Sequence, residues 1–372
     1  CKRHNRTYDF YVNLIAGIIN NIDIVIFDNN ITNVEYEALI KSNNLEKISS
    51  QNNSIKINST NFLKELIICS DSKLTLFTSG TTGTPKRITH KLSSLIQNVK
   101  TDDHYINNIW GLAYNPTHIA GIQVFLQAIL NSNTIIDIYN ISRGLILDSF
   151  SKYKITNLSA TPTFYRLLFP LNSEFKLLKQ ITVGGEKSDK NLINKLNKYF
   201  KNARITNIYA STEAGQILKS KGDFFKIENE FVKIVNNEIL IHKSLLGNND
   251  FSTSEWYQTG DLVKYIDENK VNFKIVSRKN DLINSGGYMI NLTEVEEVIM
   301  QIDGISDARV YSRNNAVIGN IILCEIELLT DSILSEEDIN TQLKNRLQTH
   351  KIPRIIKIVE SIKKTNTGKK IR

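Results

Sequence analysis

A run of nine residues rich in threonine and glycine is the strongest chemical signal in the sequence. It reads Thr78-Ser79-Gly80-Thr81-Thr82-Gly83-Thr84-Pro85-Lys86 and follows the apolar stretch Leu74–Phe77. Glycine lets backbone amides approach an anion closely, hydroxyl groups add donors, and a lysine adds positive charge. The run predicts a phosphate-binding loop, with a surface turn as the alternative. Its spacing excludes a Walker A loop, because two residues separate the last glycine from the lysine and Arg87 follows.

Further clusters along the chain combine glycine with hydroxyl, carboxylate and basic side chains. They are Val183-Gly184-Gly185-Glu186, Tyr209-Ala210-Ser211-Thr212-Glu213, Tyr257-Gln258-Thr259-Gly260-Asp261, and Ser277-Arg278-Lys279-Asn280-Asp281 with Ser285-Gly286-Gly287. Taken singly, each could be an ordinary feature of the core, a turn or the surface. Coincidence does not account for all of these clusters in this order.

The elements that must carry these clusters change in type along the chain. Helix spacing at 9–21 and 33–41 alternates with short strands at 24–27, 74–77, 155–159 and 181–183, which is typical of an α/β fold. After about residue 230 the sequence predicts two hairpins (231–242 and 263–276), helices at 293–301 and 335–348, and strands at 307–311 and 321–328. We expect an α/β domain over 1–279 and a small α+β domain over 280–372.

The order of the motifs resembles that of the adenylate-forming superfamily: acyl- and aryl-CoA synthetases, luciferases and the adenylation domains of peptide synthetases. The resemblance covers nearly the whole chain, and Lys364-Thr365-Asn366-Thr367-Gly368-Lys369 resembles the loop that carries the catalytic lysine. It implies a large N-terminal adenylation domain, here shortened at its start, and a small mobile C-terminal domain. The chain is most similar to ligases of aryl acids such as o-succinylbenzoate.

The resemblance implies a role for each matching residue. Tyr209 packs near adenine, Thr212 contacts the α-phosphate, Glu213 binds magnesium, and Asp261 accepts hydrogen bonds from both ribose hydroxyls. The residues implied to bind ATP or AMP are Thr78, Ser79, Gly80, Thr81, Thr82, Gly83, Gly184, Gly185, Glu186, Tyr209, Ala210, Thr212, Asp261 and Arg278. The residues implied to be catalytic are Lys369, Thr212, Glu213 and Lys86.

The reaction that the resemblance implies begins with a carboxylate, which is a poor electrophile until ATP converts it to an acyl-adenylate and pyrophosphate leaves. This attack brings two anions together, so the site must offset their repulsion. Lys86, Lys369 and Mg²⁺ on Glu213 suit that task, since lysine is a compact cation on a long stem. In the second step the acyl group passes to the thiol of CoA and AMP leaves. The implied cofactors are therefore ATP, Mg²⁺ and CoA.

The segment Pro116-Thr117-His118-Ile119-Ala120-Gly121 resembles the acyl-pocket motif of CoA-forming members, which places His118 and Gly121 at the pocket. A histidine satisfied within a helix is the alternative for His118. Amino-acid-activating members commonly use an aspartate near this segment, and none lies between Tyr105 and Asn133. The neighbouring apolar residues favour an apolar or aryl acid.

The second step depends, by resemblance, on rotation of the C-terminal domain about Asn280. Ser285, Gly286 and Gly287 then face the CoA thiol. Asn284 stands where the family often has lysine, a departure that concerns the CoA step more than adenylation. A stand-alone adenylation enzyme that loads the phosphopantetheine of an acyl carrier protein is therefore the alternative function.

Composition and charge limit the other classes of protein. The chain has 372 residues, 41% hydrophobic and 23% charged, which suits about two globular domains. Its three cysteines are widely spaced, which excludes a disulfide scaffold and favours a reducing cytoplasm. Polar residues interrupt every apolar stretch, so we expect no membrane span and see no signal peptide. The oligomeric state stays open.

The net charge of +8 could indicate a nucleic-acid binder, an anionic small substrate, or only a solvated lysine-rich surface. The sequence has no helix-turn-helix, zinc finger or basic patch interleaved with aromatic residues, so we expect no nucleic-acid partner. A non-catalytic homologue is a further alternative. The intact Lys369, Glu213, Asp261 and Arg278 argue against it.

Overall fold

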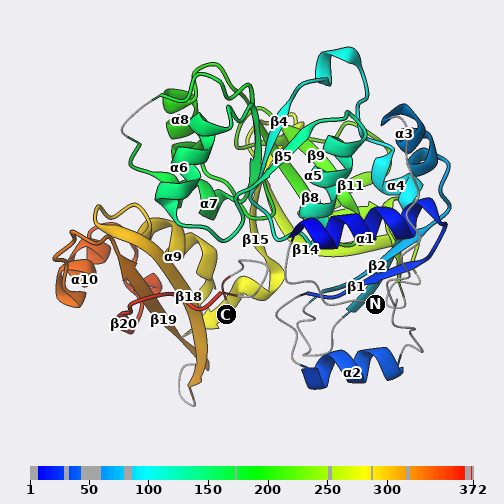
Figure 1. Cartoon of the computed structure of the whole chain (residues 1–372). Helices are drawn as coiled ribbons and strands as arrows, with labels where there is room; N and C mark the ends of the chain where they lie inside the picture. Colours follow the sequence, from blue (N-terminus) through cyan, green and yellow to red (C-terminus); the bar gives the residue numbers. More distant parts are fainter. Residues whose placement is uncertain are drawn as a thin grey trace. The chain divides into compact units, whose positions relative to one another are not determined.

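The computed structural model describes residues 7–28, 33–42, 60–78, 86–171, 174–249, 254–285, 288–315, 319–364 and 370 (Figure 1). The chain divides into two compact units, each made of two segments. Unit 1 comprises Cys1–Phe225 and His242–Glu255, and unit 2 comprises Lys226–Ile241 and Trp256–Arg372. The expected domain boundary between Lys279 and Asn280 falls inside unit 2.

A six-stranded sheet in unit 1 has the order β5-β4-β6-β7-β8-β9. Its first five strands are parallel, and β9 is antiparallel to β8. The strands are β4 Ile109–Leu112, β5 Thr134–Asp137, β6 Asn157–Ala160, β7 Gln180–Gly184, β8 Arg204–Ser211 and β9 Gly215–Ser220. The helices between them are α5 Ile119–Ile129, α6 Arg143–Lys152, α7 Pro162–Leu168 and α8 Lys190–Tyr199.

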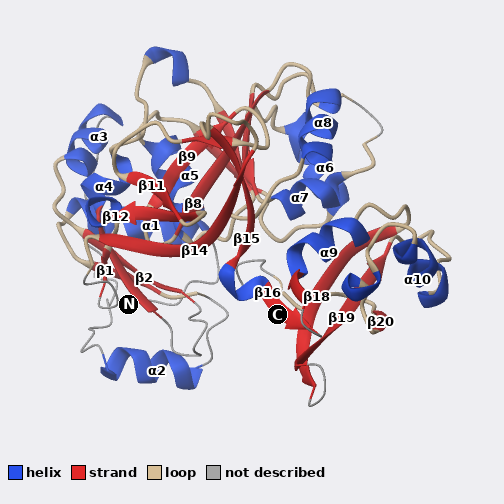
Figure 2. Ribbon diagram, turned by 180° about the vertical axis from the view of Figure 1, so that it is seen from behind, coloured by secondary structure: helices blue, strands red, loops and turns tan. Residues whose placement is uncertain are grey.

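The central strands of this sheet are short and almost continuously buried, as parallel strands covered by helices usually are. Every residue of β6 is buried, and Leu158 and Ile181 pack in one core cluster with side chains from α6, α7 and α8. The helices α6, α7 and α8 lie together beside the sheet (Figures 1 and 2). The predicted strands at 155–159 and 181–183 are thereby confirmed.

A second sheet of unit 1 carries the predicted phosphate loop. Its order is β1-β2-β3-β13, with β1 Ile24–Ile26, β2 Lys73–Thr78, β3 Lys86–Lys91 and β13 Asn248–Asn249. The helices of this region are α1 Thr7–Ile19, α2 Asn33–Ser42, α3 Thr60–Ile68 and α4 Leu92–Ile96. The predicted helices and strands before residue 78 are confirmed. The loop is followed directly by β3, which pairs antiparallel with β2, so both loop ends belong to one hairpin.

In unit 2, β11 Val232–Val235 and β12 Glu238–His242 form the predicted hairpin. Asn236 and Asn237 have φ of 50° and 61°, the left-handed conformation that a two-residue hairpin turn requires. The sheet continues through β14 Trp256–Tyr265 and β15 Asn272–Arg278 to β10 Phe225–Lys226. The second predicted hairpin is the antiparallel pair of β14 and β15.

The C-terminal part of unit 2 is the predicted α+β arrangement. Its sheet has the order β17-β16-β19-β18, and β20 pairs parallel with β19. The strands are β16 Leu282–Ser285, β17 Tyr288–Asn291, β18 Ile305–Asn315, β19 Gly319–Leu328 and β20 Ile355–Ile358, with helices α9 Leu292–Ile299 and α10 Glu336–Lys344. Both helices begin at side-chain caps, Asn291 and Ser335. None of the helices in the described ranges is long and apolar enough to cross a membrane.

Candidate active site

The carboxyl ends of the parallel strands in unit 1 bring three of the predicted motifs to one edge of the sheet. Gly184 ends β7 and lies opposite Ile208 of the adjacent strand β8. Tyr209 follows on β8, and His118 lies in the turn between β4 and α5. In open α/β sheets this edge is where ligands bind. The adenine, α-phosphate and acyl-pocket motifs therefore meet where the fold supports a site.

The glycine motif after β7 is fixed by hydrogen bonds from neighbouring elements. The Tyr114 hydroxyl donates to the Gly184 carbonyl over 3.2 Å, and Gly185 has a φ of 85°, which glycine adopts without strain. Glu186 Oε2 accepts from the backbone N–H and the hydroxyl of Thr163, at 3.2 and 2.6 Å. Glu186 therefore helps to cap the amino end of α7, a structural role that its sequence motif did not predict.

The Thr212-Glu213 backbone is held from two sides. Nε2 of His90 lies 2.7 Å from the Thr212 carbonyl, and the Gly247 N–H donates to the Glu213 carbonyl over 2.7 Å. A carbonyl can only accept, so we assign the proton of the His90 ring to Nε2. Burial lowers the pKa of His90, although the Thr212 carbonyl and the Glu213 carboxylate partly oppose this, which favours the neutral ring.

His90 and Gly247 belong to no motif, and sequence reasoning did not single them out. A Cβ added to Gly247 would lie 2.7 Å from Cε1 of the His90 ring. Gly247 is thus required by the close approach of that ring. His90 lies on β3, the strand that begins where the predicted phosphate loop ends, so one hairpin connects that loop to the Thr212-Glu213 backbone.

Glu213 would supply one carboxylate ligand to the predicted Mg²⁺ site. Among the residues that the structure describes, no group of three or more His, Cys, Asp and Glu side chains could hold a metal. Mg²⁺ is usually bound by one or two carboxylates together with substrate phosphates and water. A single half-buried carboxylate therefore fits an ion that arrives with ATP.

In unit 2 the predicted ribose acceptor Asp261 and the predicted ATP- or AMP-binding residue Arg278 face each other across a strand pair. Asp261 on β14 is directly opposite Arg278 on β15, and Arg278 Nε donates to Asp261 Oδ1 over 2.9 Å. The Asp261 side chain is 9% exposed, whereas that of Arg278 is 55% exposed. The carboxylate is therefore fixed in one orientation, while the guanidinium keeps a large solvent-facing surface.

Glu238 is the residue of this group that sequence reasoning missed. Its Oε1 accepts from the Gly260 N–H over 2.9 Å, and its Oε2 lies 2.5 Å from Lys279 Nζ. Glu238 therefore connects the residues immediately before Asp261 and after Arg278. The only sequence signal for Glu238 is that its carboxylate directly precedes the apolar run Ile239–Ile241. A carboxylate is rarely buried there without a partner.

The acyl-pocket motif includes a carboxylate from a distant part of the chain. His118 occupies the N-cap position of α5, but its side chain makes no capping hydrogen bond; its Nε2 instead lies 2.8 Å from Oδ2 of Asp28. Asn115 Nδ2 donates to the same oxygen over 3.1 Å. The sequence has no aspartate between Tyr105 and Asn133, yet the segment does have an acidic partner. Close packing requires glycine at position 121, because a Cβ on Gly121 would lie 2.3 Å from the Asn115 carbonyl oxygen.

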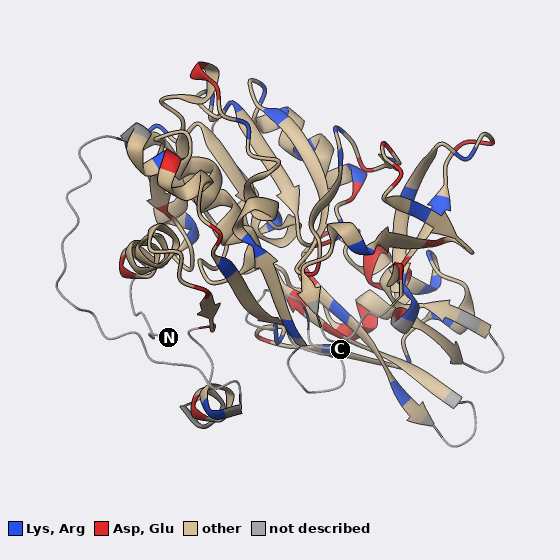
Figure 3. Cartoon of the chain, turned by 90° about the vertical axis from the view of Figure 1, so that its right-hand side faces the viewer, with Lys and Arg blue, Asp and Glu red and all other residues tan. Residues whose placement is uncertain are grey.

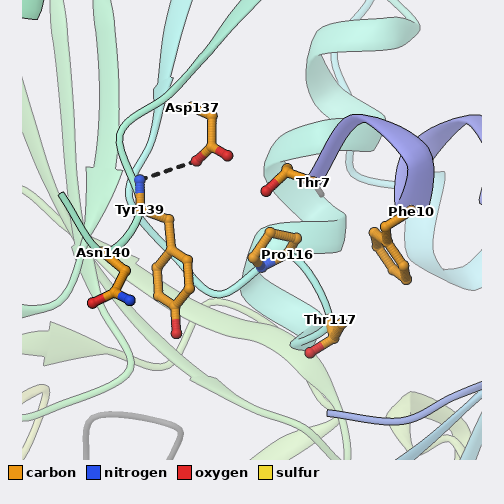
Figure 4. Close-up of a pocket in the computed structure, with 7 residues that line it drawn as sticks. All are labelled: Thr7, Phe10, Pro116, Thr117, Asp137, Tyr139 and Asn140. Atoms are coloured by element: carbon orange, nitrogen blue, oxygen red, sulfur yellow. Dashed lines mark hydrogen bonds between the residues drawn. The ribbon is translucent and has the colours of Figure 1, made fainter. Parts of the chain in front are cut away.

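A small polar cavity lies beside this motif in unit 1. Its volume is about 210 Å³, and it is lined by Thr7, Phe10, Pro116, Thr117, Asp137, Tyr139 and Asn140 (Figure 4). Burial raises the pKa of Tyr139, and the carboxylates of Asp28 and Asp137 raise it further. Two of the lining residues, Pro116 and Thr117, belong to the predicted acyl-pocket segment.

Several predicted residues lie outside the described parts of the chain. They are Ser79, Gly80, Thr81, Thr82, Gly83, Gly286, Gly287 and Lys369. For Thr78, Lys86 and Asn280 only the backbone is described. Thr78 and Lys86 are register partners at the ends of β2 and β3, and Asn280 lies in a single 3₁₀ turn. Ser285 donates to the Asn320 carbonyl over 2.6 Å.

These features define a nucleotide-binding α/β protein followed by a smaller α+β part. The sequence matches the AMP-binding enzyme family over residues 35–229 and the C-terminal domain of AMP-binding enzymes over residues 294–369. The first match covers more than half of the chain. The chain therefore belongs to the AMP-binding enzyme family. The predicted family, the fold class and the adenylate-forming type of enzyme are confirmed.

Individual relatives agree with this assignment. The chain is 28% identical to a 2-succinylbenzoate–CoA ligase of Staphylococcus epidermidis, over 79% of this chain and 67% of the relative. It is 24% identical to 4-coumarate–CoA ligase 3 of Arabidopsis thaliana, over 80% of this chain and 61% of the relative. The chain thus spans about two thirds of the length of these relatives.

Solved structures share the fold at low sequence identity. The o-succinylbenzoate CoA synthetase of Bacillus subtilis, in complex with an acyl-adenylate intermediate, has a TM-score of 0.73 and 19% identity. That similarity covers 99% of this chain and 85% of the other. An anthranilate CoA ligase in complex with anthranoyl-AMP has a TM-score of 0.74 and 16% identity, covering 97% of this chain and 83% of the other.

Proposed function

We propose that this chain is an ATP-dependent ligase that joins a carboxylic acid to the thiol of CoA. The acid's oxygen attacks the α-phosphorus of ATP, and pyrophosphate leaves with the electron pair of the broken P–O bond. The thiol sulfur then attacks the acyl carbon, loses its proton, and AMP leaves. The observation that supports the proposal most is the meeting of Gly184, Tyr209, Thr212 and His118 at one edge of the sheet.

We assign the groups that act on ATP from the motifs and their surroundings. Thr212 would contact the α-phosphate, with its backbone fixed by His90. Asp261, oriented by Arg278, would accept hydrogen bonds from the ribose hydroxyls. Mg²⁺ held by Glu213 would offset the negative charge of the phosphates. Lys86 and Lys369 would supply the remaining positive charge.

The acid is proposed to be apolar or aryl, with His118 and Gly121 at its pocket. Asp28 would fix the orientation of the His118 ring, since one of its carboxylate oxygens contacts Nε2. The relatives named as 2-succinylbenzoate–CoA ligases support an aryl acid that carries a second carboxylate.

The acceptor is proposed to be CoA, with Ser285, Gly286 and Gly287 facing the thiol. We further propose that residues 280–372 move relative to residues 1–279 about Asn280 between the two steps. An acyl carrier protein is the alternative acceptor, because Asn284 replaces a lysine common in CoA-forming members. We place the reaction in the cytoplasm, where widely spaced cysteines stay reduced.

Pyrophosphate release with ATP and Mg²⁺ tests the proposal across a panel of aryl, dicarboxylic, short-chain and medium-chain acids, with and without CoA. We expect release that depends on one class of acid, and an acyl-CoA product only when CoA is present. Lys369→Ala is the matched control, and should lose adenylation but still transfer a supplied acyl-adenylate. Acid-dependent release without a thioester would favour a carrier protein, and no acid-dependent release would refute the proposal.

A further inference from the structure

Four charged side chains meet in unit 2 beside the segment that contains Lys369. Lys370 Nζ lies 2.8 Å from Glu296 Oε1 and 2.8 Å from Asp307 Oδ1. Lys364 Nζ lies 2.6 Å from the second oxygen of Asp307. Lys370 also donates to the Ala308 carbonyl. We call Glu296, Asp307, Lys364 and Lys370 the ionic clamp.

The ionic clamp is well buried for a charged group. The exposed fractions of its side chains are 8% for Asp307, 12% for Glu296, 18% for Lys370 and 24% for Lys364. Burial alone would raise the pKa of Asp307, but the two lysines outweigh it and lower the pKa. Removing one partner of such a buried group leaves an uncompensated charge, which is strongly unfavourable. The lysines are therefore firmly held.

The acidic half of the clamp belongs to regular structure, whereas the basic half lies at the end of the chain. Glu296 lies on α9, and its Oε2 accepts from the Val310 N–H of β18 over 3.0 Å. Asp307 lies on β18 as well. Figure 3 shows basic (blue) and acidic (red) stretches interspersed along the elements. The clamp thus ties the C-terminal segment to a helix and a strand.

The two lysines of the clamp enclose the segment of Lys369. Lys364 and Lys370 pair as an isolated antiparallel bridge, so residues 365–369 join two points held by the same carboxylate, Asp307. Lys369 is bonded directly to Lys370, and neighbouring Cα atoms are about 3.8 Å apart. Of the two adjacent lysines, Lys370 is committed to the clamp. The motif had assigned Lys369 to catalysis and left Lys370 without a role.

We propose that the ionic clamp is a positioning device for the adenylation step, holding the segment from which Lys369 acts. This inference rests on the proposed function, in which Lys369 contacts the reacting carboxylate and the phosphate. Reactions depend steeply on geometry, and a misplacement of about 1 Å can cost on the order of 100-fold in rate. Lys370, Lys364, Glu296 and Asp307 are thus positioning residues rather than catalytic ones.

The proposal predicts different effects on the two half-reactions. Lys369 is needed to form the acyl-adenylate, and it leaves before the thiol attacks. Loss of the clamp should therefore slow adenylation and spare thioester formation from a supplied acyl-adenylate. General damage to unit 2 would slow both steps together.

Lys370→Met tests this, because it removes the charge and keeps a long side chain. We expect adenylation to fall by roughly 10- to 100-fold in kcat, with thioester formation changed by less than about twofold. Lys370→Arg should keep most of the adenylation rate. The matched control is Lys351→Met, which removes a similarly buried lysine of unit 2 that pairs with Glu294 of α9 over 2.7 Å. It should not show the selective loss.

Hydrogen exchange of the peptide covering residues 361–372 gives a readout that does not depend on activity. Lys370→Met should accelerate its exchange, and Lys351→Met should not. Unchanged exchange, equal loss in both half-reactions, or unchanged adenylation would each overturn the clamp as a positioning device. Faster exchange in Lys370→Met, with a wild-type chain that shows no acid-dependent pyrophosphate release, would support the clamp and refute the proposed function instead.

Discussion

Substitution of Gly247 by alanine tests whether the Thr212-Glu213 backbone is held as the contacts indicate. The new Cβ would lie 2.7 Å from Cε1 and 2.9 Å from Nδ1 of His90, and 2.9 Å from Cγ2 of Ile88. Real Cβ contacts of this length do not persist, so the imidazole or the Gly247 backbone must move. Either movement stretches a hydrogen bond to the Thr212-Glu213 backbone.

The magnitude follows from two contributions. Overpacking a closely packed site costs about 1–3 kcal/mol, and one lost hydrogen bond costs about 1 kcal/mol. We expect Gly247→Ala to lower the free energy of unfolding by about 2–4 kcal/mol. His90→Ala should cost about 1–3 kcal/mol, because the Thr212 carbonyl loses its donor. In the double variant the space of the ring accommodates most of the new methyl group.

Urea unfolding of the wild type, both single variants and the double variant measures this coupling. The double variant should be more stable than the sum of the single effects by about 1 kcal/mol or more. Pyrophosphate release should also need more Mg²⁺ in Gly247→Ala, because Glu213 shares the displaced backbone. Additive effects on unfolding, with unchanged Mg²⁺ dependence, would refute the reasoning.

Three other outcomes can be measured directly. Burial lowers the pKa of His90, so the unfolded chain binds a proton at a higher pH than the folded chain does. The free energy of unfolding should therefore fall as the pH falls below about 6.5. In thermal scans between pH 7.5 and 5, His90→Gln should show a smaller loss of stability than the wild type. Asp261→Asn should raise the KM for ATP about tenfold or more through loss of a charged acceptor, and an unchanged KM would remove Asp261 from the ribose site. Asp28→Asn should change the preference among acids in the pyrophosphate assay at constant KM for ATP, and a weaker affinity for ATP alone would contradict its place beside the acid.

The fold was predictable from the sequence wherever periodicity and turn chemistry agree. The helix at Thr7–Ile19 carries apolar residues at helical spacing, and the hairpin at Asn236-Asn237 has the residues that a left-handed turn favours. The strand Lys86–Lys91 was not predicted, because three of its six residues are basic and only Ile88 gives an apolar signal. Its pairing with β2 across the loop decides its conformation, and that pairing is not a local property.

The candidate site was predictable in its motifs but not in the residues that support them. Asp28, His90, Glu238 and Gly247 lie outside every motif, and each contacts a motif residue far away in the sequence. Motifs carry the groups that ATP and the acid would touch, and so their residue types are constrained together. A supporting residue needs only one contact, which many residue types could supply, and its partner becomes visible only once the chain is folded.

This difference also explains why the two adjacent lysines near the end of the chain could not be distinguished by charge alone. Lys369 and Lys370 have the same side chain and the same local sequence, so any rule based on composition treats them alike. The fold distinguishes them, because β18 and α9 place Asp307 and Glu296 within 2.8 Å of Lys370 Nζ. Lys370 already binds this buried pair of carboxylates. Lys369 is therefore the lysine that remains for the role in the family's motif. The contacts therefore account for the charge of Lys370, and the catalytic role of Lys369 stays a prediction.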